Sequence, residues 1–184
     1  MAAADRLPGI RPRPSLGRRL DIMARQAFPM ASAVALLLLL QLPFGFPGQA
    51  ALPPAACLGI VYFWSLFRPA AMPPLATFVL GVLLDLLGTL PSGIAPLTLL
   101  LTQGLCLRWR GGLARQGFLR IYLVFIVFAC ADAALVWALA SLLLFRVLPT
   151  APAMLQALIS ASLYPALAIL LTGAHRSIAN PDRA

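Results

Sequence analysis

Long apolar runs without charged side chains restrict this chain to few folds. Residues 26–67 carry no charge at all, and residues 121–145 form a second long run that only Asp132 interrupts. A helix that crosses a membrane needs about 20 predominantly apolar residues, more than most buried helices of soluble proteins contain in succession. With 61% hydrophobic and 10% charged residues, a soluble domain could not keep such runs covered. The sequence therefore predicts an integral membrane protein.

Clusters of proline and glycine divide the apolar runs into shorter spans. One cluster falls within residues 43–54, and the segment GTLPSG at residues 88–93 breaks the run that follows Arg68. We expect an all-α fold of six transmembrane helices near 28–43, 53–67, 74–88, 93–107, 121–145 and 154–173. The third and fourth spans have only about 15 residues each, fewer than a full crossing needs. Either neighbouring helices shield their ends, or the bilayer is locally thinner around them. The expected regions are a basic cytoplasmic tail (1–25), a six-helix membrane domain (26–174) and a second cytoplasmic tail (175–184).

The arginines predict the orientation of these spans. All fourteen basic residues are arginine. If six spans alternate across the membrane, every arginine except Arg146 lies on one face, and basic residues favour the cytoplasmic face. Both termini are therefore predicted to be cytoplasmic, whereas a five-span alternative distributes the arginines less consistently. Because the charge follows the topology and forms no single basic stripe, nucleic acid is not an expected partner.

The basic N-terminal region is expected to contact the lipid surface. Residues 1–14 are rich in proline and arginine and are predicted to form a flexible tail. Residues 15–25 place apolar side chains at helical spacing, which predicts a short interfacial helix. The arginines expected to reach lipid headgroups are Arg18, Arg19, Arg25, Arg108 and Arg110. Four aromatic residues are expected to anchor the second span at the membrane interface rather than to bind a ligand: Tyr62, Phe63, Trp64 and Phe67.

Two acids inside the apolar spans are the candidate functional residues. Asp85 and Asp132 lie roughly 16 to 18 Å from the cytoplasmic ends of their spans, so their side chains can meet. A carboxylate at such a depth is unfavourable unless it is protonated, paired or hydrated, and it commonly marks a functional path. For Asp85 a structural alternative stays open. Its carboxylate could accept hydrogen bonds from the backbone donors that open the next helix, near Ser92 and Gly93.

The residues that would carry enzymatic chemistry are missing from the sequence. The surroundings of the two acids lack the GxGD and YD motifs of intramembrane aspartyl proteases. His175, in the C-terminal tail, completes neither a catalytic triad nor a metal-ligand set. The cysteines have no CxxC spacing and are expected to be small buried apolar residues: Cys57, Cys106 and Cys130. No catalytic residue, metal site or cofactor is predicted.

One stretch of the chain has a family pattern. Residues 62–101 contain a tyrosine-aromatic pair near the end of a span, a short Arg-Pro link, and then a Phe-x-x-Gly-x-x-x-Asp span rich in leucine that ends in a glycine turn. In this stretch the chain resembles the bacterial rod-shape-determining protein MreD family. The residues that occupy the places of the pattern are Tyr62, Arg68, Pro69, Phe78, Gly81, Asp85, Gly88 and Gly93.

The resemblance implies a function without catalysis. It indicates a multi-pass subunit of the bacterial cell inner membrane, a scaffold in the elongasome that maintains cell shape and peptidoglycan synthesis. The implied partners are MreC and, through it, MreB and the peptidoglycan polymerase and transpeptidase. Membrane lipids, and a second copy of the chain in a homo-oligomer, are the other partners considered. The implied fold is similar to the substrate-binding subunits of vitamin transporters.

Those transporter subunits supply an alternative function. The chain would then be a small solute-binding membrane subunit of an energy-coupled transporter, with a cavity around Asp85 and Asp132. Such a subunit needs polar side chains that converge inside the membrane spans. Beyond the two acids, the spans offer few polar groups, namely Thr102, Gln103 and Ser141. The scaffold is therefore the favoured interpretation.

Overall fold

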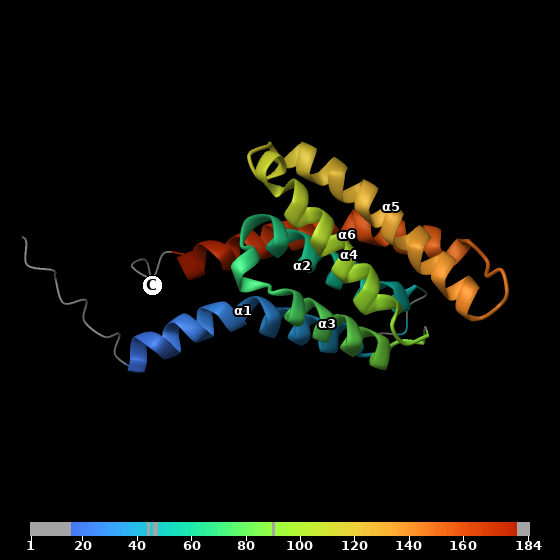
Figure 1. The fold of residues 1–184 in the computed structure, drawn as a ribbon, viewed down its shortest axis with the longest axis horizontal. Helices are drawn as coiled ribbons and strands as arrows, with labels where there is room; N and C mark the ends of the chain where they lie inside the picture. The colour runs from blue at the N-terminus through green and yellow to red at the C-terminus, as the bar shows by residue number, and fades with distance from the viewer. Residues whose placement is uncertain (1–15, 44, 46–47, 90, 180–184) are drawn as a thin grey trace, which may run out of the picture.

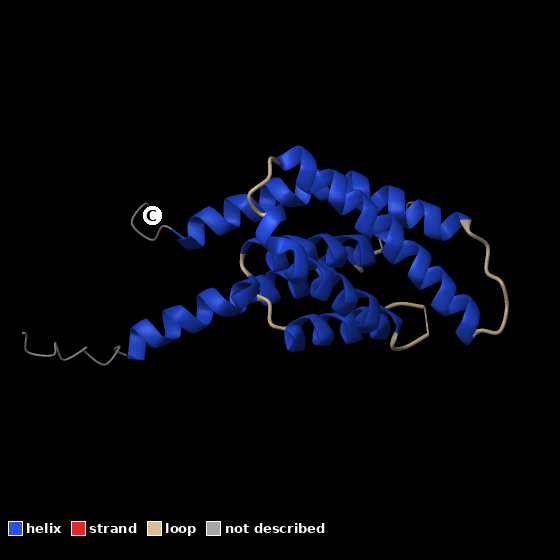
Figure 2. Ribbon diagram, turned by 45° about the horizontal axis from the view of Figure 1, so that its top comes forward, coloured by secondary structure: helices blue, strands red, loops and turns tan. Residues whose placement is uncertain are grey.

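The computed structural model describes residues 16–43, 45, 48–89 and 91–179. The described residues form helices and turns without any strand, which confirms the predicted all-α class (Figures 1 and 2). The helices are α1 (Leu16–Leu40), α2 (Leu52–Phe67), α3 (Pro74–Leu87), α4 (Ile94–Leu113), α5 (Phe118–Leu143) and α6 (Ala151–Ala179), with short 3-10 helices η1 (Gln49–Ala51) and η2 (Pro69–Ala71). Each predicted span corresponds to one of the six helices.

Proline and glycine determine where the central helices begin and end. Pro74 is the first residue of α3, where a missing N–H is tolerated because the first turn leaves that donor unused. Gly88 follows the last residue of α3, and Gly93 precedes α4 with a φ of 101°. A side chain with a Cβ rarely adopts this left-handed conformation, so the turn before α4 requires glycine.

The chain passes between two ends of one elongated bundle. The α2–α3 and α4–α5 links lie at the end where α1 begins and α6 finishes (Figure 1). The α1–α2, α3–α4 and α5–α6 links lie at the opposite end. This alternation is the one expected of six antiparallel spans.

Helix α2 forms the centre of the bundle. It contacts α1, α3, α4, α5 and α6, and all its residues from Ala55 to Leu66 are buried. Tyr62, Phe63 and Trp64 are at most 3% exposed, so the prediction that they anchor the chain at the membrane interface is wrong. Because other helices surround α2, its aromatic side chains pack in the protein core, and only Phe67 at the end of the helix is exposed.

Two of the predicted boundaries fall inside helices. The interfacial helix predicted over 15–25 and the first span are one continuous helix, α1, which contains Pro29. The boundary placed at residue 25 therefore falls inside a helix, as does the one at 174, since α6 continues to Ala179. The structure does not describe residues 1–14, nor the side chains of Arg18, Arg19 and Arg25.

The polar loop predicted after residue 107 is shorter than expected. Helix α4 continues through Arg108 and Arg110 to Leu113, and both arginines are exposed. Arginine has a high helix propensity, so charged residues at the end of an apolar span can continue the same helix. The link to α5 therefore contains only residues 114–117.

Among the described residues, three helical segments are long and apolar enough to cross a membrane. They are Gln49–Phe67, Phe118–Leu143 and Ala151–Gly173, with 19, 26 and 23 residues. Phe28–Leu40 and Pro74–Leu87 are shorter apolar helical segments. In the α2 segment 78% of the most apolar window is buried inside the protein, against 33% in α5 and 28% in α6. Most of the apolar window of α5 and of α6 therefore faces outward.

Candidate functional site

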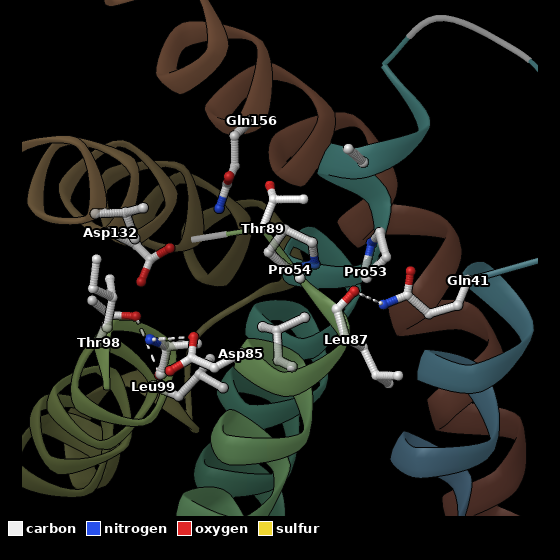
Figure 3. Close-up of a pocket in the computed structure, with 16 residues that line it drawn as sticks. Gln41, Pro53, Pro54, Asp85, Leu87, Thr89, Thr98, Leu99, Asp132 and Gln156 are labelled. Atoms are coloured by element: carbon white, nitrogen blue, oxygen red, sulfur yellow. Dashed lines mark hydrogen bonds between the residues drawn. The ribbon is translucent and has the colours of Figure 1, made fainter. Parts of the chain in front are cut away.

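A cavity of about 250 Å³ lies among the helices near the end of the bundle that carries the α3–α4 turn (Figure 3). We call it the acid cavity, because both Asp85 and Asp132 line it. Its other polar side chains are Gln41, Thr89, Thr98 and Gln156, and its apolar wall includes Pro53, Pro54, Leu84, Leu87, Ile94, Leu99 and Val136. The two acids that the sequence singled out therefore line one cavity.

Asp85 binds the first turn of the following helix. Its Oδ2 accepts a hydrogen bond from the Gly93 N–H at 2.5 Å, and its Oδ1 accepts one from the Ala95 N–H at 3.1 Å. The first N–H groups of a helix have no partner within that helix, and they carry the positive end of its dipole. Asp85 therefore caps α4 across the turn, which is the structural arrangement that the sequence left open.

The close packing of α3 on α4 brings Asp85 to this position. Gly81 lies one turn before Asp85 and is buried. A Cβ built at Gly81 would overlap Pro96, at 2.6 Å from its nitrogen, so the two helices meet backbone to backbone. Any side chain at residue 81 would separate α3 from α4 and move the carboxylate away from the donors that it caps.

Asp132 reaches the acid cavity from the opposite wall, in the middle of α5. It is 7% exposed, and its Oδ1 has no hydrogen-bond partner. The Thr98 side chain lies beside its carboxyl group, while the Thr98 hydroxyl donates to the Ala95 carbonyl at 3.4 Å. In the interior of a helix the backbone N–H groups already bond to carbonyls of the same helix, so no backbone donor is free for Asp132.

The remaining polar residues of the acid cavity come from other helices. Gln41, which follows α1, donates to the Leu87 carbonyl at 3.1 Å and so satisfies the end of α3. The amide of Gln156, from α6, points inward, as does the Asp132 carboxyl group (Figure 3). Sequence reasoning missed Gln41, Thr98 and Gln156, although a glutamine inside or beside an apolar run is a signal that could have found two of them.

The polar groups that the sequence singled out lie elsewhere. Gln103 is buried and donates to the Met72 carbonyl at 2.7 Å, which holds the α2–α3 link against α4. The Ser141 hydroxyl accepts a hydrogen bond from the Leu148 N–H at 3.2 Å and orders the α5–α6 link. Thr102 is buried and does not line the acid cavity.

Tyr62 belongs to the frame around the site. Its hydroxyl donates to the Ile121 carbonyl at 2.9 Å, and its ring packs edge-on against Phe125 and Tyr164. These contacts join α2 to α5 and α6. Tyr62 is completely buried, so it holds helices together and does not reach the acid cavity.

The other residues of the family pattern differ in position. Arg68 and Pro69 end α2 and open η2, and Phe78 is 45% exposed on α3. Gly88 follows α3 and lines the acid cavity together with Asp85. Most of the pattern therefore positions helices, and only Asp85 and Gly88 reach the cavity.

The cysteines are free thiols. Cys57 and Cys106 are buried, whereas Cys130 is exposed, which contradicts the prediction that all three are buried. Residue 130 lies on the outward face of α5, where an apolar run gives no sign of which side chains face other helices. Within the part of the chain that the structure describes, no three His, Cys, Asp or Glu side chains lie close enough together to hold a metal ion.

Comparison of the chain with protein-family models, with curated proteins and with solved structures finds no match. The class of protein is defined by the structure itself. The described residues form an all-helical bundle, and three of their helices have the length and composition to cross a membrane. Its candidate site is a cavity in which one carboxylate is fully bonded to backbone donors and a second is not.

Proposed function

We propose that this protein is a multi-pass protein of the bacterial inner membrane, with six helices that cross the bilayer and both termini in the cytoplasm. Two observations support this topology. The links between helices alternate between the two ends of the bundle (Figure 1). Of the arginines that the structure describes, all except Arg146 belong to segments at the end where α1 begins and α6 finishes, as expected of a cytoplasmic excess of basic residues.

Reporter fusions test this topology. Fusions after residue 180 and within residues 114–117 are expected to report a cytoplasmic location. Fusions near residues 46–50 and 147–151 are expected to report a periplasmic one. A periplasmic C-terminus would exclude the six-span arrangement, because an even number of spans returns the chain to the side on which it began.

Within the membrane, the proposed function is that of a non-enzymatic scaffold of the elongasome, as the resemblance to the MreD family implies. The observation that carries this proposal is the part that the family pattern plays in the bundle. Tyr62 joins α2 to α5, Gly81 lets α3 touch α4, and Asp85 caps α4. These residues maintain a rigid frame, as a scaffold requires.

The frame leaves apolar surface for partners or lipids. Five large side chains of α3 are exposed, at 71%, 45%, 41%, 73% and 43%: Leu75, Phe78, Val79, Leu86 and Leu87. Helix α3 is also short, with 14 residues. A transmembrane helix of a partner such as MreC, packed beside α3, would cover this surface and lengthen the apolar region around it.

Co-purification from native membranes tests the scaffold. The full chain is expected to bring down MreC, and depletion of the chain in a rod-shaped cell is expected to produce round or swollen cells. As a matched pair of variants, Leu75→Ala with Phe78→Ala on α3 is expected to reduce MreC recovery, whereas Leu158→Ala with Ile169→Ala on α6 is not. Unchanged cell shape after depletion, with no MreC recovered, would contradict the proposal.

The transporter-subunit alternative has one observation in its favour. The acid cavity gathers Asp132, Thr98 and Gln156, so its wall is more polar than the sequence suggested. Solute sites usually combine an apolar wall with a few polar groups that fix the ligand's orientation. Loss of uptake of a vitamin on deletion of the chain, with cell shape unchanged, would favour this alternative over the scaffold.

A further inference from the structure

Two carboxyl groups line the acid cavity, and no basic side chain is among the described residues that line it. Asp85 and Asp132 approach it from α3 and α5, and none of the residues that line it is an arginine. Arg146, in the α5–α6 link, is exposed and does not line the cavity. Carboxylates in an apolar environment require a positive charge or hydrogen-bond donors close to them.

The two acids differ in what they still require. Both oxygens of Asp85 already accept backbone N–H groups. Asp132 is more than nine-tenths buried, its Oδ1 has no donor, and its carboxyl group points inward (Figure 3). The Thr98 side chain lies within hydrogen-bonding reach of this carboxyl group, and its hydroxyl also donates to the Ala95 carbonyl at 3.4 Å. A ligand with an N–H donor would supply what the helices around Asp132 do not.

We propose that the acid cavity binds a small aliphatic amine, with its ammonium group on Asp132 and its carbon chain against the apolar wall. A cavity of about 250 Å³ is larger than one dehydrated metal ion needs. Much of the lining is apolar and includes residues such as Leu84, Leu99 and Val136. A lining of this kind suits an aliphatic chain.

An ammonium group suits the side chains around Asp132. It has three donors around one nitrogen, and it can serve the Asp132 carboxyl group together with a second acceptor such as the Gln156 or Thr98 side chain. Both oxygens of Asp85 already accept backbone N–H groups.

Isothermal titration of the full chain in detergent micelles tests the proposal with three five-carbon probes. Cadaverine carries an ammonium group at each end, 1,5-pentanediol is its neutral counterpart, and glutarate is its anionic counterpart. Cadaverine is expected to bind saturably, with one molecule per chain, and the other two are not expected to bind. Equal binding of pentanediol, or no saturable binding of cadaverine, would overturn the proposal. Displacement of cadaverine by an equal concentration of sodium chloride would overturn it as well, because the site would then bind any monovalent cation and would not recognise an amine.

Variants locate the site. Asp132→Asn is expected to weaken cadaverine binding by at least about tenfold, because the group that pairs with the ammonium is removed. Val136→Phe, one turn further along α5, fills the cavity without changing either acid and is expected to abolish binding. Val127→Phe makes the same substitution on the exposed face of α5, where Val127 is 66% exposed, and is expected to bind like the unchanged chain. Unchanged affinity in Val136→Phe would place the amine elsewhere and overturn the inference.

Amine binding does not depend on the proposed scaffold function. The titration uses the purified chain, whereas the scaffold is tested by recovery of MreC from membranes. Asp132→Asn and Val136→Phe are expected to leave MreC recovery unchanged, because the outer face of α3 is not altered. Failure of one proposal is therefore measured separately from failure of the other.

Discussion

The two acids of the cavity differ in where their helices place them. Asp85 lies in the last turn of α3, where the start of α4 offers backbone N–H groups, and it accepts two of them. Asp132 lies in the middle of α5, where every nearby backbone donor is already used, and its Oδ1 has no partner. An aspartate side chain therefore stabilises the bundle where it meets free N–H groups at a helix end, and destabilises it where it is buried without donors at a helix centre.

This difference separates structural from functional residues more clearly than burial does. Asp132 is 7% exposed whereas Asp85 is half-buried, so by burial alone Asp132 would be taken for the structural acid and Asp85 for the one open to a ligand. Their hydrogen bonds give the opposite impression. The α3–α4 corner is satisfied by its own residues, whereas the α5 wall keeps a polar atom whose requirement only a ligand, water or a proton can meet. Substitutions at the α3–α4 corner and on α5 test this comparison.

The largest effect is expected for Asp85→Leu. It leaves the N–H groups of Gly93 and Ala95 without their acceptor, at a cost of about 3 kcal/mol in the free energy of unfolding. Asp85→Asn keeps one acceptor oxygen and is expected to lose about half as much. The measurement is reversible unfolding of the purified chain in micelles titrated with a denaturing detergent. Equal stability of Asp85→Leu and the unchanged chain would show that the cap is not needed.

The next effect is expected for Gly81→Ala, which places a methyl group against Pro96 and separates α3 from α4. The expected loss is about 2 kcal/mol in the free energy of unfolding, as for overpacking in a rigid core. Gly104→Ala is the matched control, because a Cβ at residue 104 in α4 would have no atom within 4 Å. That control is expected to gain up to about 1 kcal/mol from the higher helix propensity of alanine. Unfolding of both variants in the same detergent titration measures these differences. Equal stability of the two variants would show that the α3–α4 contact does not limit the stability of the bundle.

The smallest effect, and one of opposite sign, is expected for Asp132→Leu. Removal of a carboxyl group that lacks a full set of partners, at nearly constant side-chain volume, should leave the stability unchanged or raise it by about 1 kcal/mol. The same detergent titration measures it beside Asp85→Leu. A loss as large as that of Asp85→Leu would show that Asp132 has a structural partner, and the two acids would then not differ as described.

Much of the fold could be predicted from short-range patterns. Proline and glycine mark the ends of α2, α3 and α4, and their effect depends only on the backbone at those residues. The predicted spans therefore coincide with the six helices to within a few residues at most of their ends. How far a helix continues beyond its apolar residues was harder to predict. In α4, Arg108 and Arg110 end the apolar pattern but do not end the helix.

The site was predictable in part. The sequence identified Asp85 and Asp132 because an acid in an apolar run is conspicuous, and the helical rise placed them at similar depth. It did not identify Thr98 or Gln156, and it assigned the aromatic residues of α2 to the membrane interface. Apolar side chains that face lipid and those that face other helices have the same composition, so the sequence does not separate them.

The sequence alone determined the helical class, the ends of α2 and α3 and the places of the arginines along the chain, since these depend on local backbone chemistry and on the order of residues. The tertiary structure decided which helix is central, that Asp85 caps α4, and that Asp132 Oδ1 is left without a donor. Those features arise from contacts between helices distant in the sequence. Such contacts depend on which faces meet, as where the Gly81 backbone touches Pro96, and no local pattern specifies the partner.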